Sequence, residues 1–149
     1  MLATTRFNKT TWNEWARQSL INNRYSYYSP RRISSTVKKI IVIELNNEDN
    51  MVMGIGFISN IPIHDHVNTF SRQWYNKVRY VCEHRVDRAT LNVNVKLTTG
   101  EEVCLLEYLD QVCFKGNSHC KRNCGITRFP RKFNLAPESL NVLFKKKHV

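Results

Sequence analysis

Two apolar runs separated by a polar turn constrain the fold of this chain more than any other feature. Residues 37–45 read Val-Lys-Lys-Ile-Ile-Val-Ile-Glu-Leu and are rich in β-branched residues, which favour strands. Residues 46–50, Asn-Asn-Glu-Asp-Asn, supply turn chemistry before a second run at residues 51–59. The pattern predicts a β-hairpin. Gly54 and Gly56 alternate in the second run, so they face the same side of that strand or mark a bulge.

Further strands are predicted at residues 76–83 and 88–97, and in the second of these Leu91, Val93, Val95 and Leu97 alternate with polar residues. Helical spacing of Val103, Leu106, Leu109 and Val112 or Cys113 predicts a helix that Gly116 ends. A first short helix is expected to be capped by Thr10 or Thr11, residues 22–35 are expected to form a loop, and Pro137 is expected to open a last short helix.

Strands in the middle with helices at the edges predict an α+β fold with a small mixed or barrel-like sheet. A chain of 149 residues predicts a single domain, 1–149, in which basic segments 1–36 and 115–149 flank a β-rich core, 37–114. The longest aliphatic block, Ile40–Ile43, is too short to cross a membrane, and the polar N-terminus lacks the apolar stretch of a signal peptide. We therefore expect an intracellular protein whose five cysteines are thiols.

Positive charge is concentrated at the two ends of the chain. The chain has 23 Lys and Arg against 12 Asp and Glu, a net charge of +11. Residues 1–36 carry +5, residues 37–114 carry −2 and residues 115–149 carry +8. Such flanks suit a polyanionic partner, because cations gain affinity by releasing counterions from phosphates. The alternative interpretation is that the charge only aids solubility.

The late segment that follows the predicted helix combines cations, hydroxyl groups and glycine, a mixture that suits phosphate contact. The alternative is a solvated connection to the last helix. The candidate nucleic-acid-binding residues are Lys115, Ser118, Lys121, Arg122, Thr127, Arg128, Arg131 and Lys132, together with Arg31 and Arg32 of the other basic flank.

No pattern in the chain predicts a cofactor, a metal or an enzyme. Cys113, His119, Cys120 and Cys124 are zinc-binding residue types, but their irregular spacing disfavours a site, and His64 and His66 alone seldom form one. Nucleophile-elbow, phosphate-loop and paired-carboxylate motifs are absent from the sequence. The residues favour a binding protein over an enzyme.

The order of these motifs carries a resemblance. Residues 53–60, Met-Gly-Ile-Gly-Phe-Ile-Ser-Asn, are followed by the stretch 74–88 that begins Trp-Tyr-Asn-Lys-Val-Arg-Tyr, then by the predicted helix and by His-Cys-Lys-Arg-Asn-Cys-Gly-Ile-Thr-Arg-Phe-Pro at 119–130. Over residues 37–133 this order resembles small proteins of large nucleocytoplasmic DNA viruses. It is more remotely similar to the PUA-like superfamily, which includes the EVE, ASCH and YTH domains. The resemblance implies a strongly curved or closed β-barrel with flanking helices that binds RNA or a modified base.

Such a fold would open a base pocket beside the glycine strand. Its candidate residues are Gly54, Gly56, Trp74, Tyr75, Arg79 and Arg85, with an aromatic ring as the stacking wall and an arginine on the phosphate. The competing interpretation is that the glycines only permit a sharp bend, with Trp74 in the core.

Two functions follow from these observations. The first is a nucleic-acid-binding viral protein, for DNA or RNA, that acts in the host cytoplasm or nucleus and contacts phosphates through its basic flanks. The second is a structural or capsid-associated protein of a virion, whose charge meets acidic protein surfaces.

Overall fold

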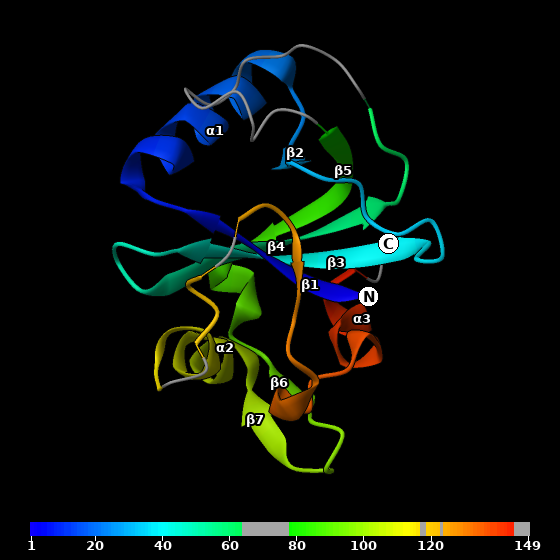
Figure 1. Cartoon of the computed structure of the whole chain (residues 1–149). Helices are drawn as coiled ribbons and strands as arrows, with labels where there is room; N and C mark the ends of the chain where they lie inside the picture. Colours follow the sequence, from blue (N-terminus) through cyan, green and yellow to red (C-terminus); the bar gives the residue numbers. More distant parts are fainter. Residues whose placement is uncertain (64–77, 117–118, 123, 145–149) are drawn as a thin grey trace, which may run out of the picture.

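The computed structural model describes residues 1–63, 78–116, 119–122 and 124–144. A mixed sheet lies in the middle, with α1 on one face and α2 and α3 on the other (Figure 1), so the fold is α+β as predicted. The helices and strands are β1 (Leu2–Phe7), α1 (Lys9–Asn22), β2 (Ser26–Ser29), β3 (Lys39–Asn46), β4 (Met51–Ser59), β5 (Val78–Asp87), β6 (Asn94–Lys96), β7 (Glu102–Cys104), α2 (Leu105–Phe114), β8 (Thr127–Arg128) and α3 (Asn141–Phe144), with 3-10 turns η2 (Arg88–Leu91), η3 (Arg131–Phe133) and η4 (Pro137–Leu140).

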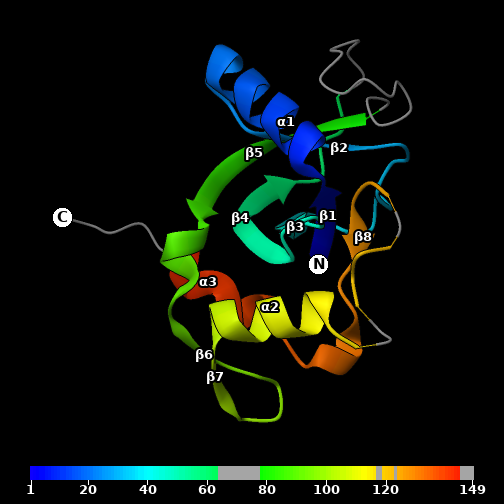
Figure 2. The same ribbon diagram turned by 90° about the vertical axis from the view of Figure 1, so that its left-hand side faces the viewer.

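The main sheet has six strands in the order β2-β5-β4-β3-β1-β8. β1 runs parallel to β3, and the other neighbouring pairs are antiparallel. Register shifts between Glu44 and Leu45 and between Phe57 and Ile58 interrupt the ladders, and such irregularities bend a sheet. Figure 2 shows the resulting curvature, so the sheet is a half-barrel rather than a closed one.

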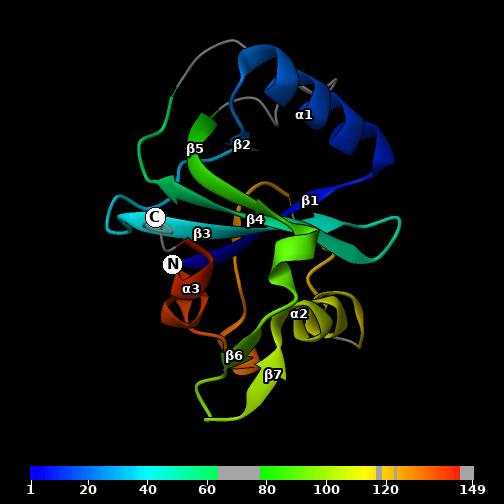
Figure 3. The same ribbon diagram turned by 180° about the vertical axis from the view of Figure 1, so that it is seen from behind.

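The predicted hairpin is confirmed as β3 and β4, and it separates two hydrophobic cores. Ile41, Ile43 and Leu45 of β3 belong to the core on the α2 side, whereas Ile40 and Val42 belong to the core on the α1 side. Consecutive residues of a strand point to opposite faces. β3 is buried at every position from Ile40 to Asn46, so it is covered on both faces, as Figure 3 shows from behind.

The cap predicted for the first helix is wrong by two residues or more. Asn8 is the N-cap of α1, where its side chain accepts from the Thr11 backbone N–H at 2.8 Å while the Thr11 hydroxyl accepts from the Asn8 backbone N–H at 2.9 Å. Thr11 is thus the third helical residue of a capping box and not the cap. The helix buries Trp15, whose indole Nε1 donates to the Ser26 carbonyl at 2.5 Å.

Two strands lie in segments whose sequence gave no strand signal. β1 precedes α1 and β2 falls inside the predicted loop 22–35. Both contain buried polar residues, Thr4 and Thr5 in β1 and Ser26 and Ser29 in β2. Tertiary pairing with β3 and β5 decides their conformation, because polar composition alone favours loops.

The remaining elements follow the predicted burial more closely than the predicted conformation. Leu91, Val95 and Leu97 are buried and Asn92, Asn94 and Lys96 exposed, yet the strand spans only Asn94–Lys96 because residues 88–91 form η2. The later predicted helix is confirmed but begins at Leu105, since residues 102–104 pair as β7 with β6. Pro137 opens η4 as expected, and Leu140 and Leu143 are buried.

Candidate functional site

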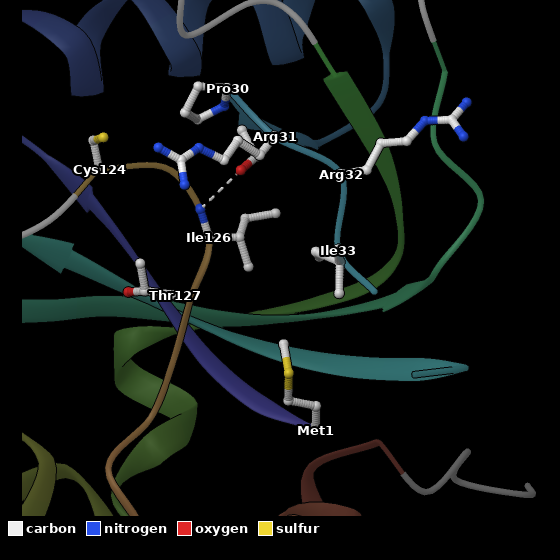
Figure 4. A pocket seen from close by; sticks show the side chains of 9 residues that line it. Met1, Pro30, Arg31, Arg32, Ile33, Cys124, Ile126 and Thr127 are labelled. Atoms are coloured by element: carbon white, nitrogen blue, oxygen red, sulfur yellow. Dashed lines mark hydrogen bonds between the residues drawn. The ribbon is translucent and has the colours of Figure 1, made fainter. Parts of the chain in front are cut away.

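The two basic flanks of the chain meet at a seam, which we define as residues 29–33 and 124–127. Gly125 has a φ of +71°, and a Cβ placed there would lie 2.5 Å from Pro30 Cδ and 2.7 Å from Ser29 Oγ. The Ile126 backbone N–H donates to Ser29 Oγ at 3.4 Å, the dashed line in Figure 4. The left-handed backbone and the close approach both require glycine. Position 125 therefore joins two segments that lie far apart in the sequence.

Arg6 of β1 holds the late segment against the sheet. Its Nε donates to the Cys120 carbonyl at 2.6 Å and its Nη1 to the Gly125 carbonyl at 3.3 Å. Its Nη2 donates to the Thr4 hydroxyl at 2.6 Å and also to the Thr127 hydroxyl. One guanidinium thereby fixes both ends of residues 120–127 to β1.

Two further contacts fix the start of the late segment. The Cys120 backbone N–H donates to the Cys113 carbonyl at 2.7 Å, and the Asn47 side-chain amide donates to the Lys121 carbonyl at 2.9 Å. The thiols of Cys113 and Cys120 share a hydrogen bond, which raises the pKa of Cys113 and lowers that of Cys120. The backbone that carries Lys121 and Arg122 is therefore anchored rather than loose.

A pocket of about 570 Å³ opens at the seam, within the range of small-molecule sites. Its lining combines apolar side chains with three polar residues and two arginines (Figure 4). The lining residues are Met1, Ser29, Pro30, Arg31, Arg32, Ile33, Cys124, Ile126 and Thr127.

Cations surround this pocket. Arg31 and Arg32 are exposed, and Arg31 has no hydrogen-bond or ion-pair partner within the described part of the chain. In Figure 4 the side chain of Arg31 reaches toward Cys124 while that of Arg32 points the other way. Arg128 is also exposed; it follows the lining residue Thr127 in the chain and pairs with Ala3, two positions from the lining residue Met1. The mouth of the pocket is therefore electropositive.

The other predicted phosphate-binding residues are distributed around the late segment. Lys115, Arg122, Arg131 and Lys132 are exposed, and Lys121 is half-buried. The hydroxyl of Thr127 contacts Arg6 and Thr4 inside the sheet, so it is engaged within the protein. Ser118 lies outside the described residues, as do His64 and His66. Among the described residues, no group of three or more His, Cys, Asp and Glu side chains could hold a metal ion.

The space beside the glycine strand is filled by the protein's own side chains. A Cβ at Gly56 would lie 2.5 Å from Tyr27 Cε2, and one at Gly54 would lie 2.7 Å from an Arg85 nitrogen and 2.9 Å from Glu44 Oε1. The glycines do face one side, as predicted, but a base over Gly56 would have to displace the Tyr27 ring. Trp74 and Tyr75 lie outside the described residues.

Tyr27, Glu44 and Arg85 form a buried network on that face. Arg85 Nε donates to Glu44 Oε2 at 2.7 Å and its Nη2 to Glu44 Oε1 at 2.6 Å, while the Tyr27 hydroxyl donates to Oε2. Burial raises the pKa of Glu44 and raises that of Tyr27 well above its ordinary value. The hydrogen bonds and charge of Arg85 oppose the shift of Glu44. A carboxylate that is fully buried requires such a partner.

Three aromatic rings surround the Arg85 guanidinium. Its Cζ lies 5.8 Å from the ring centre of Trp12, 5.4 Å from that of Trp15 and 4.9 Å from that of Tyr25. The cation thus lies within cation–π distance of all three rings. Arg85 also pairs with Asp87, and Arg79 donates to Ser26 Oγ at 3.2 Å. Both arginines proposed for a base pocket therefore have partners inside the protein.

Comparisons with known proteins are sparse for this chain. No protein family and no curated protein matches it. Among solved structures it is similar to the YTH domain of the Zygosaccharomyces rouxii MRB1 protein, which was solved in complex with N6-methyladenosine RNA. The identity is 16%, the match covers 99% of this chain and 89% of that one, and the TM-score is 0.36.

The fold and the seam together define an α+β domain with a curved mixed sheet and an electropositive pocket lined from both edge strands, β2 and β8. Within the described residues, no helix is long and apolar enough to span a membrane.

Proposed function

We propose that the protein binds nucleic acid through the cations at the seam. The observation that supports this most is the meeting of the two basic flanks around one pocket. Exposed Arg31 lines the pocket, and exposed Arg128 directly follows the lining residue Thr127. Arginine suits phosphate because its planar guanidinium forms paired hydrogen bonds with phosphate oxygens. The role is one of binding and not of catalysis.

When cations contact phosphates, the salt dependence of the affinity reports how many phosphates are neutralised. Each phosphate neutralised contributes about −0.9 to the slope of log K against log salt on duplex DNA and about −0.7 on single strands. Removing three contacting cations should therefore reduce the slope by roughly 2 to 3. A purely solubilising charge predicts no such local effect.

The test compares two triple variants that lose the same charge. Arg31→Ala/Arg32→Ala/Arg128→Ala removes the seam cations, and Lys9→Ala/Arg17→Ala/Arg24→Ala removes three exposed cations of α1 and its C-terminal end. Fluorescence anisotropy with labelled 12-nucleotide single strands and duplexes, DNA and RNA, is measured from 50 to 200 mM salt.

We expect the seam variant to lose affinity and slope on every sequence, and the α1 variant to bind nearly as the wild type does. Equal losses in the two variants would show that only net charge matters. Absence of binding by the wild-type protein at 50 mM salt would refute the proposal.

A second candidate is an interaction protein, which the exposed apolar end of α1 favours. Leu20 is 82% exposed and Ile21 69% exposed at adjacent positions, and adjacent apolar groups on a surface mark protein contacts. This candidate predicts a stable oligomer or a complex with a protein partner, and Leu20→Ser/Ile21→Ser should abolish that association in analytical ultracentrifugation.

Membership of the viral group, a place in a virion and an intracellular address remain predictions from the sequence.

A further inference from the structure

We propose that the seam pocket takes one unpaired base of a single strand, whose neighbouring phosphates lie on Arg31 and Arg128. This inference rests on the proposed function and narrows its ligand from nucleic acid in general to single-stranded nucleic acid. It also places a base site at the seam rather than beside the glycines at positions 54 and 56, where Tyr27 fills the space.

The pocket lining matches the two chemical parts of a nucleotide. Ile33 and Ile126 are half-buried and pack on the α1-side core, so each leaves apolar surface in the pocket. Apolar side chains pack against the flat face of a base. Guanidinium groups donate hydrogen bonds to phosphates or stack on bases. A site built for phosphate alone would have no use for the apolar part.

A paired duplex does not fit this arrangement. Its bases are stacked and present only edges in the grooves, whereas its outer surface is phosphate and sugar. A concave pocket can be filled only by a base that leaves the stack, and that step costs least in a single strand. The pocket therefore discriminates against duplexes, which the charge alone would not do.

The first experiment separates bases from phosphates. A 12-nucleotide single strand of mixed sequence is compared with an abasic strand of equal length and charge, by anisotropy at fixed salt. We expect the abasic strand to bind at least about fivefold more weakly, because base contacts are lost while phosphates remain. Ile33→Trp, which fills the pocket, should reduce this ratio toward one. Ile61→Trp at a 70%-exposed position outside the lining is the matched control and should keep the ratio.

The pocket also carries its own probe. Cys124 lines the pocket and is exposed, whereas Cys113 and Cys120 are buried and Cys82 and Cys104 are half-buried. The intact single strand should slow alkylation of Cys124 by iodoacetamide severalfold, and the abasic strand should protect it less. This measurement uses the wild-type protein, so it decides the matter even if Ile33→Trp does not fold.

The outcomes separate the two proposals. Equal affinity for intact and abasic strands with equal protection of Cys124 would overturn the base site and leave phosphate binding intact. Duplex binding as tight as single-strand binding would do the same. If the wild-type protein bound neither the intact nor the abasic strand, the proposed function itself would be overturned.

Discussion

Replacing Arg85 by methionine tests how much the buried network across β3, β4 and β5 stabilises the protein. Met is of similar length and apolar, so Arg85→Met removes the charge and leaves the Glu44 carboxylate buried without its partner. Breaking a buried ion pair on one side costs about 3–5 kcal/mol. A domain of this size has roughly 5–15 kcal/mol of stability in total, so the loss is a large part of it and should lower Tm by about 10 °C.

Two comparisons isolate the cause. Arg85→Met/Glu44→Leu removes both charges and should recover most of the lost stability, because no unpaired carboxylate remains. Arg88→Met breaks the pair with Asp110, whose side chains are 30% and 27% exposed, and should cost only about 1 kcal/mol. Urea unfolding followed by tryptophan fluorescence measures all three.

The penalty of Arg85→Met should also depend on pH. Burial raises the pKa of Glu44 above 4.5, and Arg85 opposes that rise. Without Arg85 the folded state binds a proton more tightly than the unfolded chain, so falling pH stabilises the variant until about the unfolded value of 4.5. The difference between the single and double variants should be largest at pH 7 and smallest near pH 4. A single variant as stable as the double at pH 7, or a difference that pH leaves unchanged, would refute this account.

Three further changes have definite expectations. Gly56→Ala should lower the free energy of unfolding by about 1–3 kcal/mol in urea, because its Cβ would overlap the Tyr27 ring. Asn8→Ala should cost about 1 kcal/mol in the same assay, because it removes the capping box of α1. In native alkylation followed by peptide mass mapping, Cys124 should react first and buried Cys113 only after unfolding.

The sequence reveals the hairpin but not the network that the hairpin supports. Glu44 is the one acidic residue in the apolar run 37–45, and a charge in such a run is a sign of a buried partner. The partner lies 41 positions further along the chain. Glu44 is opposite Gly54 and Gly56 is opposite Arg85, so only the register of three strands brings the two charges together. The register between β4 and β5 depends on the irregularity between Phe57 and Ile58, which no local sequence pattern predicts.

The sequence predicts the two basic segments of the seam but not that they lie side by side. The excess of Lys and Arg in residues 1–36 and 115–149 can be read directly from the sequence. Their meeting depends on β8, a strand of two residues that pairs Thr127 with Thr4 and Arg128 with Ala3. It depends also on Gly125, whose close contact with Pro30 forms only when the two segments come together. Both the pairing of β8 with β1 and the contact of Gly125 with Pro30 are tertiary, so no local sequence pattern predicts them.

The arginines of this protein divide by what their guanidinium groups contact, and this division decides how substitutions should be interpreted. Arg85 and Arg88 bind carboxylates of the chain, and Arg6 binds the carbonyls of the late segment. Arg6 is therefore a positioning residue. Its removal would weaken nucleic-acid binding by loosening residues 120–127, with a parallel loss of hydrogen-exchange protection there. Removal of Arg31, which has no such partner in the described structure, would change the salt slope and leave that protection as it is.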